Sequence, residues 1–351
     1  MRAQTLFIAF ALVASASRAA EVDSFTDRRA LKDSAPALNT LVNAWMDEAL
    51  VAANKPPLMG ESPKCDPARL YEELEKKLGG FVVGHVEAAV NEDEAIDKIV
   101  VPYERSIYRD IDFRASPTVA MTHRLATLVR VGDVYLGTDK FGHFFSEGYT
   151  YFKLYKDAGP DAPLAFGELS ETTFFGQMTT GVYSYADLTA NLNGLRFWNA
   201  VLGEREDPFN QGKVQNPYVQ CVDDRWQRVR DFDWRDYVDD AWDEAKNCNA
   251  VKSREFYDHL VPHIRALTGG KGCPIASLNA PALKKKYGGF FPFVCNTRGL
   301  VVREVPLRPR FDNYLNKVVK QRFERKLKHK LPLLKTLSPS GKAGAARTGS
   351  R

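Results

Sequence analysis

The fold is decided by residues 138–198, which read TDKFGHFFSEGYTYFKLYKDAGPDAPLAFGELSETTFFGQMTTGVYSYADLTANLNGLRFW. Apolar residues recur at helical spacing in three parts of this stretch, and Gly159-Pro160 separates the first part from the second. Ser184 and Asp187 have the Ser-x-x-Asp form of a capping box, which marks the start of a helix. The pattern predicts three neighbouring helices, at about 139–156, 164–178 and 184–202.

Each of these helices carries polar residues on one face, because residues three or four apart are neighbours on a helix. The three polar stripes are Asp139, His143 and Glu147 on the first helix, Glu168 and Glu171 on the second, and Asp187 and Asn191 on the third. Gly194 follows on the third helix and would let another part of the chain approach closely. Since short connections join the helices, we expect the stripes to converge on one buried polar site.

Carboxylates together with an imidazole are ligands for hard and borderline divalent cations, and they equally suit general acid–base chemistry. The candidate metal ligands are Asp139, His143, Glu171 and Asp187, of which His143, Glu171 and Asp187 are also the candidate catalytic residues. The sequence therefore predicts a site for a divalent metal ion of unspecified identity. A structural interpretation stays open: Asp139 would interact with the helix dipole, Asp187 would complete the capping box, and His143 would be a hydrogen-bonded core residue.

The same stretch resembles a known pattern. In residues 138–198 the chain is similar to VanZ-like proteins and to small bacterial envelope lipoproteins, which share the order D-K-x-x-H, E, then D-x-x-A-N-x-x-G. The matching positions are Asp139, Lys140, His143, Glu171, Asp187, Asn191 and Gly194. The resemblance implies a shared functional site more than a particular activity.

The N-terminus has the features of a secretory signal peptide. Arg2 supplies a positive charge, residues 6–14 are mostly apolar, and small residues allow cleavage after Ala16 or Ala19. The mature protein is therefore expected to be exported and to be periplasmic or secreted. No later apolar run approaches the roughly 18 to 20 residues needed to cross a bilayer, so we predict no transmembrane span in the mature chain.

Export would permit disulfide bonds, and the chain has five cysteines. Their odd number leaves at least one thiol unpaired or intermolecular. The pairings expected first are the local ones, Cys221 with Cys248 and Cys273 with Cys295, although sequence alone does not fix connectivity. No pair has the C-x-x-C spacing of a structural zinc site.

Charge is unevenly distributed along the chain. The net charge of +5 combines +2 from Arg2 and Arg18, +10 from residues 317–351, and −7 from the residues between. Residues 311–330 alternate apolar and basic side chains, which predicts a cationic amphipathic helix that binds an anionic envelope surface, and residues 338–351 are expected to be disordered. Nucleic acid is not an expected partner of an exported protein.

These features suggest four parts: a signal peptide at 1–19, a helical domain at 20–202, a cysteine-containing helical part at 203–316 that packs separately or with the former, and a basic tail at 317–351. The fold class is mainly α, with a helical bundle-like core, a β-hairpin and irregular connectors. Further elements are expected as helices at 35–53, 66–77, 121–128, 234–245, 253–267 and 283–287, and as a hairpin at 129–136. Trp226, Trp234 and Trp242, interleaved with charges, predict a charged amphipathic helical surface.

Two functions remain open at this point. The first is an exported cell-envelope protein in which a bound cation activates water to hydrolyse an envelope substrate, with Asn191 as an orienting residue. The second is a non-catalytic envelope scaffold or binding protein in which the polar cluster is structural. His259 and His263 are interpreted as structural, and the chain has no G-x-S-x-G, Walker A or G-x-G-x-x-G motif.

Overall fold

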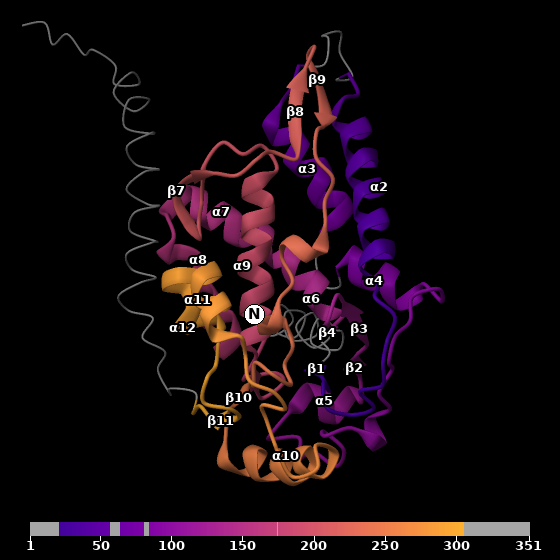
Figure 1. The fold of residues 1–351 in the computed structure, drawn as a ribbon, viewed down its shortest axis with the longest axis vertical. Coiled ribbons are helices and arrows are strands. Elements are labelled where there is room, and N and C mark those ends of the chain that lie inside the picture. Colours follow the sequence, from indigo (N-terminus) through magenta and orange to yellow (C-terminus); the bar gives the residue numbers. More distant parts are fainter. Residues whose placement is uncertain (1–20, 57–63, 81–83, 174, 305–351) are drawn as a thin grey trace, which may run out of the picture. The chain divides into compact units, whose positions relative to one another are not determined.

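The computed structural model describes residues 21–56, 64–80, 84–173 and 175–304. The predicted signal peptide and basic tail lie outside these residues. Within them the fold is mainly α, as predicted (Figure 1). The helices before residue 202 are α2 (Ala35–Ala53), α3 (Pro67–Leu78), α4 (His85–Glu92), α5 (Pro117–Thr122), α6 (Asp139–Gly142), α7 (Gly148–Ala158), α8 (Asp161–Thr172) and α9 (Tyr185–Ala200). They are followed by α10 (Arg254–Leu267), α11 (Ala280–Tyr287) and α12 (Phe291–Val294).

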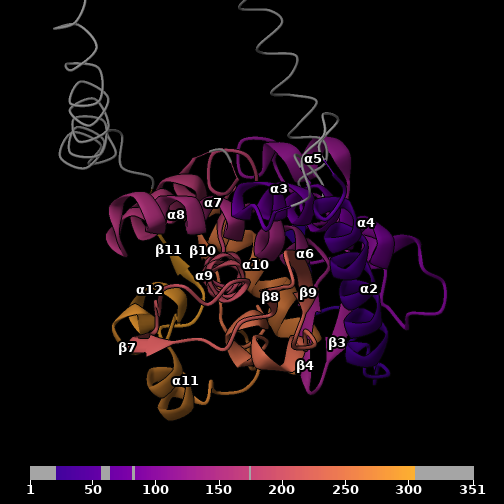
Figure 2. The same ribbon diagram turned by 90° about the horizontal axis from the view of Figure 1, so that it is seen from above.

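Helix α9 is the centre of the core. Every residue of this helix except Arg196 is buried, as expected for a helix that is surrounded on all sides. Seen nearly along its axis, α9 lies beside α7, α8 and α12, all of which contact it (Figure 2). It begins where sequence predicted, because the Ser184 hydroxyl accepts a hydrogen bond from the Asp187 backbone N–H at 3.1 Å.

The strands are short and make small sheets. The hairpin of β3 (Leu128–Val131) and β4 (Val134–Gly137) turns at Gly132 and confirms the predicted hairpin. A three-stranded sheet joins β5 (Val182–Tyr183), β10 (Ala250–Val251) and β11 (Val301–Val302). The remaining pairs are β1 (Glu21–Val22) with β2 (Leu125–Ala126), β6 (Glu206–Asp207) with β7 (Asn210–Val214), and β8 (Val219–Val222) with β9 (Arg225–Arg228). Because β5 directly precedes α9, the three-stranded sheet fixes the start of the central helix.

The predicted helix at 234–245 is wrong. This segment forms two 3-10 turns, Trp234–Asp236 and Asp240–Trp242, each begun by an aspartate whose side chain accepts a backbone N–H. Trp234 and Trp242 are fully buried and Trp226 is nearly so, which also contradicts the predicted charged surface. The burial of these large rings outweighs the local helical spacing.

The aromatic core draws on distant parts of the chain. Phe144 lies against Trp234 with ring centroids 4.9 Å apart, and Phe145 lies edge-on to Phe197 at 5.4 Å. Phe232 contacts Trp234 at 5.0 Å. Residues on both sides of position 202 therefore contribute to one hydrophobic core.

Other expectations differ at their boundaries. The predicted helix at 121–128 is instead the end of α5, which stops at Thr122 before His123 in a left-handed conformation, followed by strands β2 and β3. Helix α8 begins earlier than predicted and ends at Thr172 rather than 178. Helices α2, α3 and α10 lie where they were predicted, and α11 begins at Ala280, before its predicted start.

The disulfides are not the expected local pairs. Cys65 bonds to Cys221 and Cys248 bonds to Cys273, whereas Cys295 is buried and free in the described part of the chain. The first bond joins residues 156 positions apart, so its partners are brought together by the tertiary fold and not by local sequence. The expectation of an unpaired cysteine is confirmed. Among the described residues, no helix is long and apolar enough to cross a membrane.

Candidate metal centre

A buried lysine organises the site. The ammonium Nζ of Lys140, on α6, lies 2.7 Å from Asp139 Oδ2, 2.6 Å from Asp187 Oδ1 and 2.7 Å from Glu244 Oε1. The Lys140 side chain is 1% exposed, so these ion pairs are shielded from water. Burial alone would lower the pKa of Lys140, but the three carboxylates outweigh burial and hold this pKa well above its ordinary value.

His143 lies between two polar groups, one at each ring nitrogen. Its Nε2 is 3.1 Å from Asp187 Oδ2, and its Nδ1 is 3.1 Å from both Glu147 Oε1 and Asn191 Oδ1. The Asn191 amide in turn donates to Glu147 Oε2 at 2.8 Å and to the hydroxyl of Tyr151. These contacts fix the plane of the imidazole and the position of both nitrogens.

Two backbone features bring the helices together. Residues His143–Glu147 form a π-helical segment between α6 and α7, a feature that often marks functional sites. Beyond it, Gly148 lies against Gly194 of α9 so closely that a Cβ on Gly148 would stand 2.6 Å from the Gly194 Cα. A Cβ on Gly194 would collide with the Phe144 carbonyl oxygen. The predicted close approach at Gly194 is therefore present, and it carries Asp187 and Asn191 toward His143.

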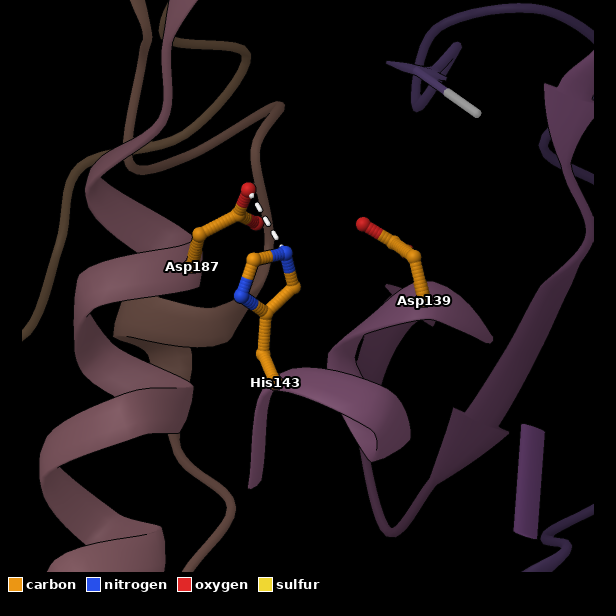
Figure 3. A group of neighbouring side chains, drawn as sticks. All are labelled: Asp139, His143 and Asp187. Atoms are coloured by element: carbon orange, nitrogen blue, oxygen red, sulfur yellow. Dashed lines mark ion pairs between the residues drawn. The ribbon is translucent and has the colours of Figure 1, made fainter. Parts of the chain in front are cut away.

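Asp139, His143 and Asp187 are close enough together that they could hold a cation. One possible ligand atom from each residue lies within 4.8 Å of the others. Figure 3 shows the imidazole of His143 beside the carboxylate of Asp187, with Asp139 directed toward the same region. Asp139 Oδ1 is buried and has no hydrogen-bond partner among the described residues. A buried carboxylate oxygen without a partner is costly, and a cation would satisfy it.

Burial and neighbouring charges shift the pKa values of the site residues in different directions. Burial would raise the pKa of Asp187, but His143 and Lys140 outweigh burial and hold it below its ordinary value. The pKa of His143, which burial would lower, is held well above its ordinary value by Asp187 and Glu147. Burial raises the pKa of Asp139 despite the nearby Lys140. Asp187 and His143 therefore form an ion pair in this structure.

Three carboxyl groups near the site were missed by sequence reasoning: Glu21 on β1, Glu87 on α4, and Glu244 after the second 3-10 turn. Burial and the nearby Glu244 raise the pKa of Glu21 to about 8. Burial and Asp139 raise the pKa of Glu87 to about 7. None of the three has a helical spacing to residues 138–198 in sequence, so only the tertiary fold reveals them.

The predicted site residues do not all meet. Lys140, Glu147 and Asn191 join the centre through the contacts above. Glu171 is fully buried nearby, but its Oε2 accepts the Ser184 backbone N–H at 3.0 Å, and it is not part of the group whose ligand atoms converge. Glu168 lies apart, where it accepts the hydroxyl of Tyr183 at 2.8 Å and pairs with Arg303.

The structure also tests the alternative in which Asp187 only completes the capping box of its helix. In a complete capping box the Asp187 carboxylate would return to the backbone N–H of Ser184. Instead the two Asp187 oxygens lie against Lys140 and His143. Asp187 therefore does more than cap its helix.

The residues of the centre are partly open to solvent. The side chains of Asp139, His143 and Asp187 are 13%, 14% and 11% exposed, so the centre is not completely closed off from solvent. A separate surface cavity of about 490 Å³, lined by residues such as Leu164, Phe209 and Phe290, does not include the centre.

Comparison with protein-family models, curated proteins and solved structures found no match for this chain.

Proposed function

We propose that the protein is an exported cell-envelope hydrolase that binds one divalent cation through Asp139, His143 and Asp187. The observation that carries this proposal is that the two oxygens of each carboxylate have different partners. Each gives one oxygen to Lys140, while Asp187 Oδ2 lies at His143 Nε2 and Asp139 Oδ1 is buried without a partner. Lys140 thus leaves the second oxygen of each carboxylate to other contacts: Asp187 Oδ2 faces His143 Nε2, and Asp139 Oδ1 would gain a partner from a cation.

The charge balance supports a bound cation. The acidic groups in and around the centre are Glu21, Glu87, Asp139, Glu147, Glu171, Asp187 and Glu244. The positive groups that face them are Lys140 and the protonated form of His143. A divalent cation would compensate part of this excess, which the metal-free protein meets by keeping several carboxyls protonated.

The surroundings of His143 fit a metal-ligating imidazole. A histidine that binds a metal through one nitrogen usually donates its other N–H to a carboxylate or carbonyl, which fixes its tautomer. Here Nε2 faces Asp187, and Nδ1 has Glu147 and Asn191 as acceptors. An imidazole with two carboxylates suits borderline Zn²⁺ and also the harder Mn²⁺, whereas Ca²⁺ prefers a set of oxygen ligands alone.

Three protein ligands leave a coordination position for water, as in catalytic rather than structural metal sites. A cation bound there would lower the pKa of that water and supply a nucleophile near neutral pH. The chain's own groups would hold the ligands in place: Lys140 orients the carboxylates, and Glu147 with Asn191 orients the imidazole. The two disulfides in the described residues are compatible with an oxidising, extracytoplasmic location.

Metal binding is tested first, by titrating metal-stripped protein with Zn²⁺ and with Mn²⁺ in a calorimeter. We expect one ion per chain, and loss of binding in His143→Ala, Asp139→Asn and Asp187→Asn with circular dichroism unchanged. Glu168→Gln is the matched control, because Glu168 lies on a neighbouring helix and pairs elsewhere. Wild-type protein that takes up neither ion would refute the metal site.

Hydrolysis is tested with p-nitrophenyl acetate as a general probe of a metal-activated water. We expect turnover that requires the added ion, disappears with a chelator and is absent in His143→Ala. Export is tested by mass spectrometry of the protein secreted from a bacterial host, with the mature chain expected to begin after Ala16 or Ala19. A protein that binds metal but shows no metal-dependent turnover would favour a binding role over catalysis.

A structural role is the second candidate, and one observation favours it. Lys140 already supplies a cation to Asp139, Asp187 and Glu244. If that is the whole purpose of the cluster, the substitutions above will lower stability by similar amounts and the wild type will bind no metal. The titration therefore separates the two functions.

A further inference from the structure

The start of α9 uses an acid from another helix. In a capping box, the hydroxyl of the first residue accepts the N–H of the residue three positions on, and the acid at that position accepts the N–H of the first. The first half is present, since Asp187 N donates to Ser184 Oγ at 3.1 Å. The second half is supplied by Glu171 of α8, whose Oε2 accepts the Ser184 N–H at 3.0 Å.

Because Glu171 accepts the Ser184 N–H, both oxygens of Asp187 can make other contacts. One carboxylate oxygen of Asp187 lies 2.6 Å from Lys140 Nζ and the other 3.1 Å from His143 Nε2. A carboxylate that turned back to cap Ser184 would have to give up at least one of these contacts. A buried N–H at Ser184 without an acceptor would be costly, so the helix needs some carboxylate or carbonyl at this point.

We propose that Glu171 is a positioning residue: it caps α9 in place of Asp187 and thereby leaves Asp187 free to bind the cation and to orient His143. This inference rests on the proposed function for its cation, and it assigns Glu171 a role other than that of metal ligand. The hydrogen bond requires an acceptor oxygen at Glu171 and does not require a negative charge.

Glu171 is held for this role by its own surroundings. Its side chain is fully buried, and its backbone carbonyl accepts the N–H of Gln177 at 2.8 Å in the turn after α8. The backbone at Gly176 lies so close to the Glu171 carbonyl that a Cβ there would collide with it. The hydroxyl of Ser184 is fixed as well, because it donates to Glu244 Oε1 at 3.0 Å.

The test compares Glu171→Gln with Glu171→Ala in the full chain, using Zn²⁺ titration. Glutamine keeps a carbonyl oxygen that can accept the Ser184 N–H, so we expect Zn²⁺ affinity within about threefold of wild type. Alanine removes the acceptor, and we expect a loss of about 10- to 100-fold, the usual size for a residue that orients a ligand. Glu168→Ala, one turn earlier on α8, is the control and should leave the affinity unchanged.

The outcomes separate a capping role from a ligand role. If Glu171→Gln loses as much affinity as Glu171→Ala, the charge matters, Glu171 acts as ligand or base, and the inference is overturned. Unchanged affinity in Glu171→Ala would overturn it as well. If Glu171→Ala does not fold, Glu171→Gln alone decides between the two roles.

A second readout needs no metal and keeps this inference apart from the proposed function. In protein labelled with ¹⁵N-histidine, the His143 Nε2 resonance reports its hydrogen bond to Asp187. We expect the wild-type spectrum in Glu171→Gln and a shifted Nε2 resonance in Glu171→Ala, where Asp187 turns toward Ser184. Wild-type protein that binds no Zn²⁺ refutes the proposed function, whereas an unshifted resonance in Glu171→Ala refutes the positioning role.

Discussion

Lys140 shows how strongly one residue can determine the state of a site. Its ammonium group is the shared partner of three buried carboxylates. Removing one partner of a buried ion pair leaves uncompensated charge and typically costs about 3–5 kcal/mol. We expect Lys140→Met to lower the free energy of unfolding by about this amount in urea titrations of the metal-free protein.

The control for this prediction is an exposed lysine with the same kind of partners. Lys76 pairs with Glu72 and Glu73 but is 53% exposed, and solvent screens exposed ion pairs so that they contribute little to stability. Lys76→Met should therefore change the unfolding midpoint little. Equal effects of the two substitutions would mean that the Lys140 cluster is not the stabilising network that its burial indicates.

The raised pKa values predict an unusual pH dependence. Folded Glu21 and Glu87 keep their protons to about pH 8 and 7, whereas the unfolded chain releases them near its ordinary pKa of 4.5. The raised pKa of His143 acts in the same direction. The stability that protonated His143 contributes is present below its unfolded pKa of 6.5 and is lost as the pH rises toward its higher folded pKa. Because the folded state binds more protons in this window, the free energy of unfolding must fall as the pH increases.

We expect the urea midpoint of metal-free protein to decrease from pH 5 to pH 8. Each carboxyl contributes a slope of up to about 1.4 kcal/mol per pH unit. Glu21→Gln and Glu87→Gln should each flatten the curve, because glutamine has no proton to lose. A midpoint that rises over this range would show that these carboxyls are ionised in the folded protein.

At the scale of single elements, the crossing of α9 with the π-helical segment positions the centre. A Cβ on Gly194 would collide with the Phe144 carbonyl oxygen, which belongs to rigid backbone. Gly194→Ala must therefore separate the two elements, and overpacking of this kind costs about 1–3 kcal/mol. We expect lower stability in thermal unfolding and weaker Zn²⁺ binding, because Asp187 and Asn191 would move away from His143.

Gly289→Ala provides the matched glycine control for that experiment. A Cβ at Gly289 would meet no atom within 4 Å, and its backbone is not left-handed. The substitution should leave both stability and Zn²⁺ affinity near wild type. If Gly194→Ala behaves in the same way, the close approach of the helices is not needed for the site.

Elements with strong local signals could be predicted from sequence. Helix α2 lies where its apolar spacing placed it, and α9 begins at its Ser184 cap. The segment 234–245 could not be predicted, because its tryptophans satisfy a tertiary core and aspartates cap two short turns. Local patterns predict elements well where the local preference and the tertiary packing agree.

For the candidate site, too, local sequence patterns identified some residues and only the tertiary fold revealed the others. The i, i+4 spacing brought out Asp139, His143, Asp187 and Asn191, and the structure places all four together. The spacing also suggested Glu168, which lies on the same helix as Glu171 but pairs with Tyr183 and Arg303. Glu21, Glu87 and Glu244 come from separate elements, and no local period could have identified them.

At the scale of the whole molecule, charge divides the chain into unlike parts. Residues 317–351 carry eleven lysines and arginines and one glutamate, whereas residues 20–316 have a net charge of −7. A basic segment near an anionic bilayer gains about 1 kcal/mol per cation, and this attraction is screened by salt. An acidic body with a cationic segment suits a protein that meets an anionic envelope surface through that segment.

We therefore expect the full chain to sediment with phosphatidylglycerol-containing vesicles at low salt, and to remain in solution with neutral phosphatidylcholine vesicles. Deleting residues 317–351 should abolish sedimentation, because it removes ten net positive charges. Deleting only residues 338–351 is the control: it removes Lys342, Arg347 and Arg351 and leaves +7 in 317–337, so most binding should persist. Salt at about 0.5 M should release the full chain, since exposed charges are screened over a few ångströms under those conditions. Binding that survives both the longer deletion and high salt would place the attachment in the folded body instead.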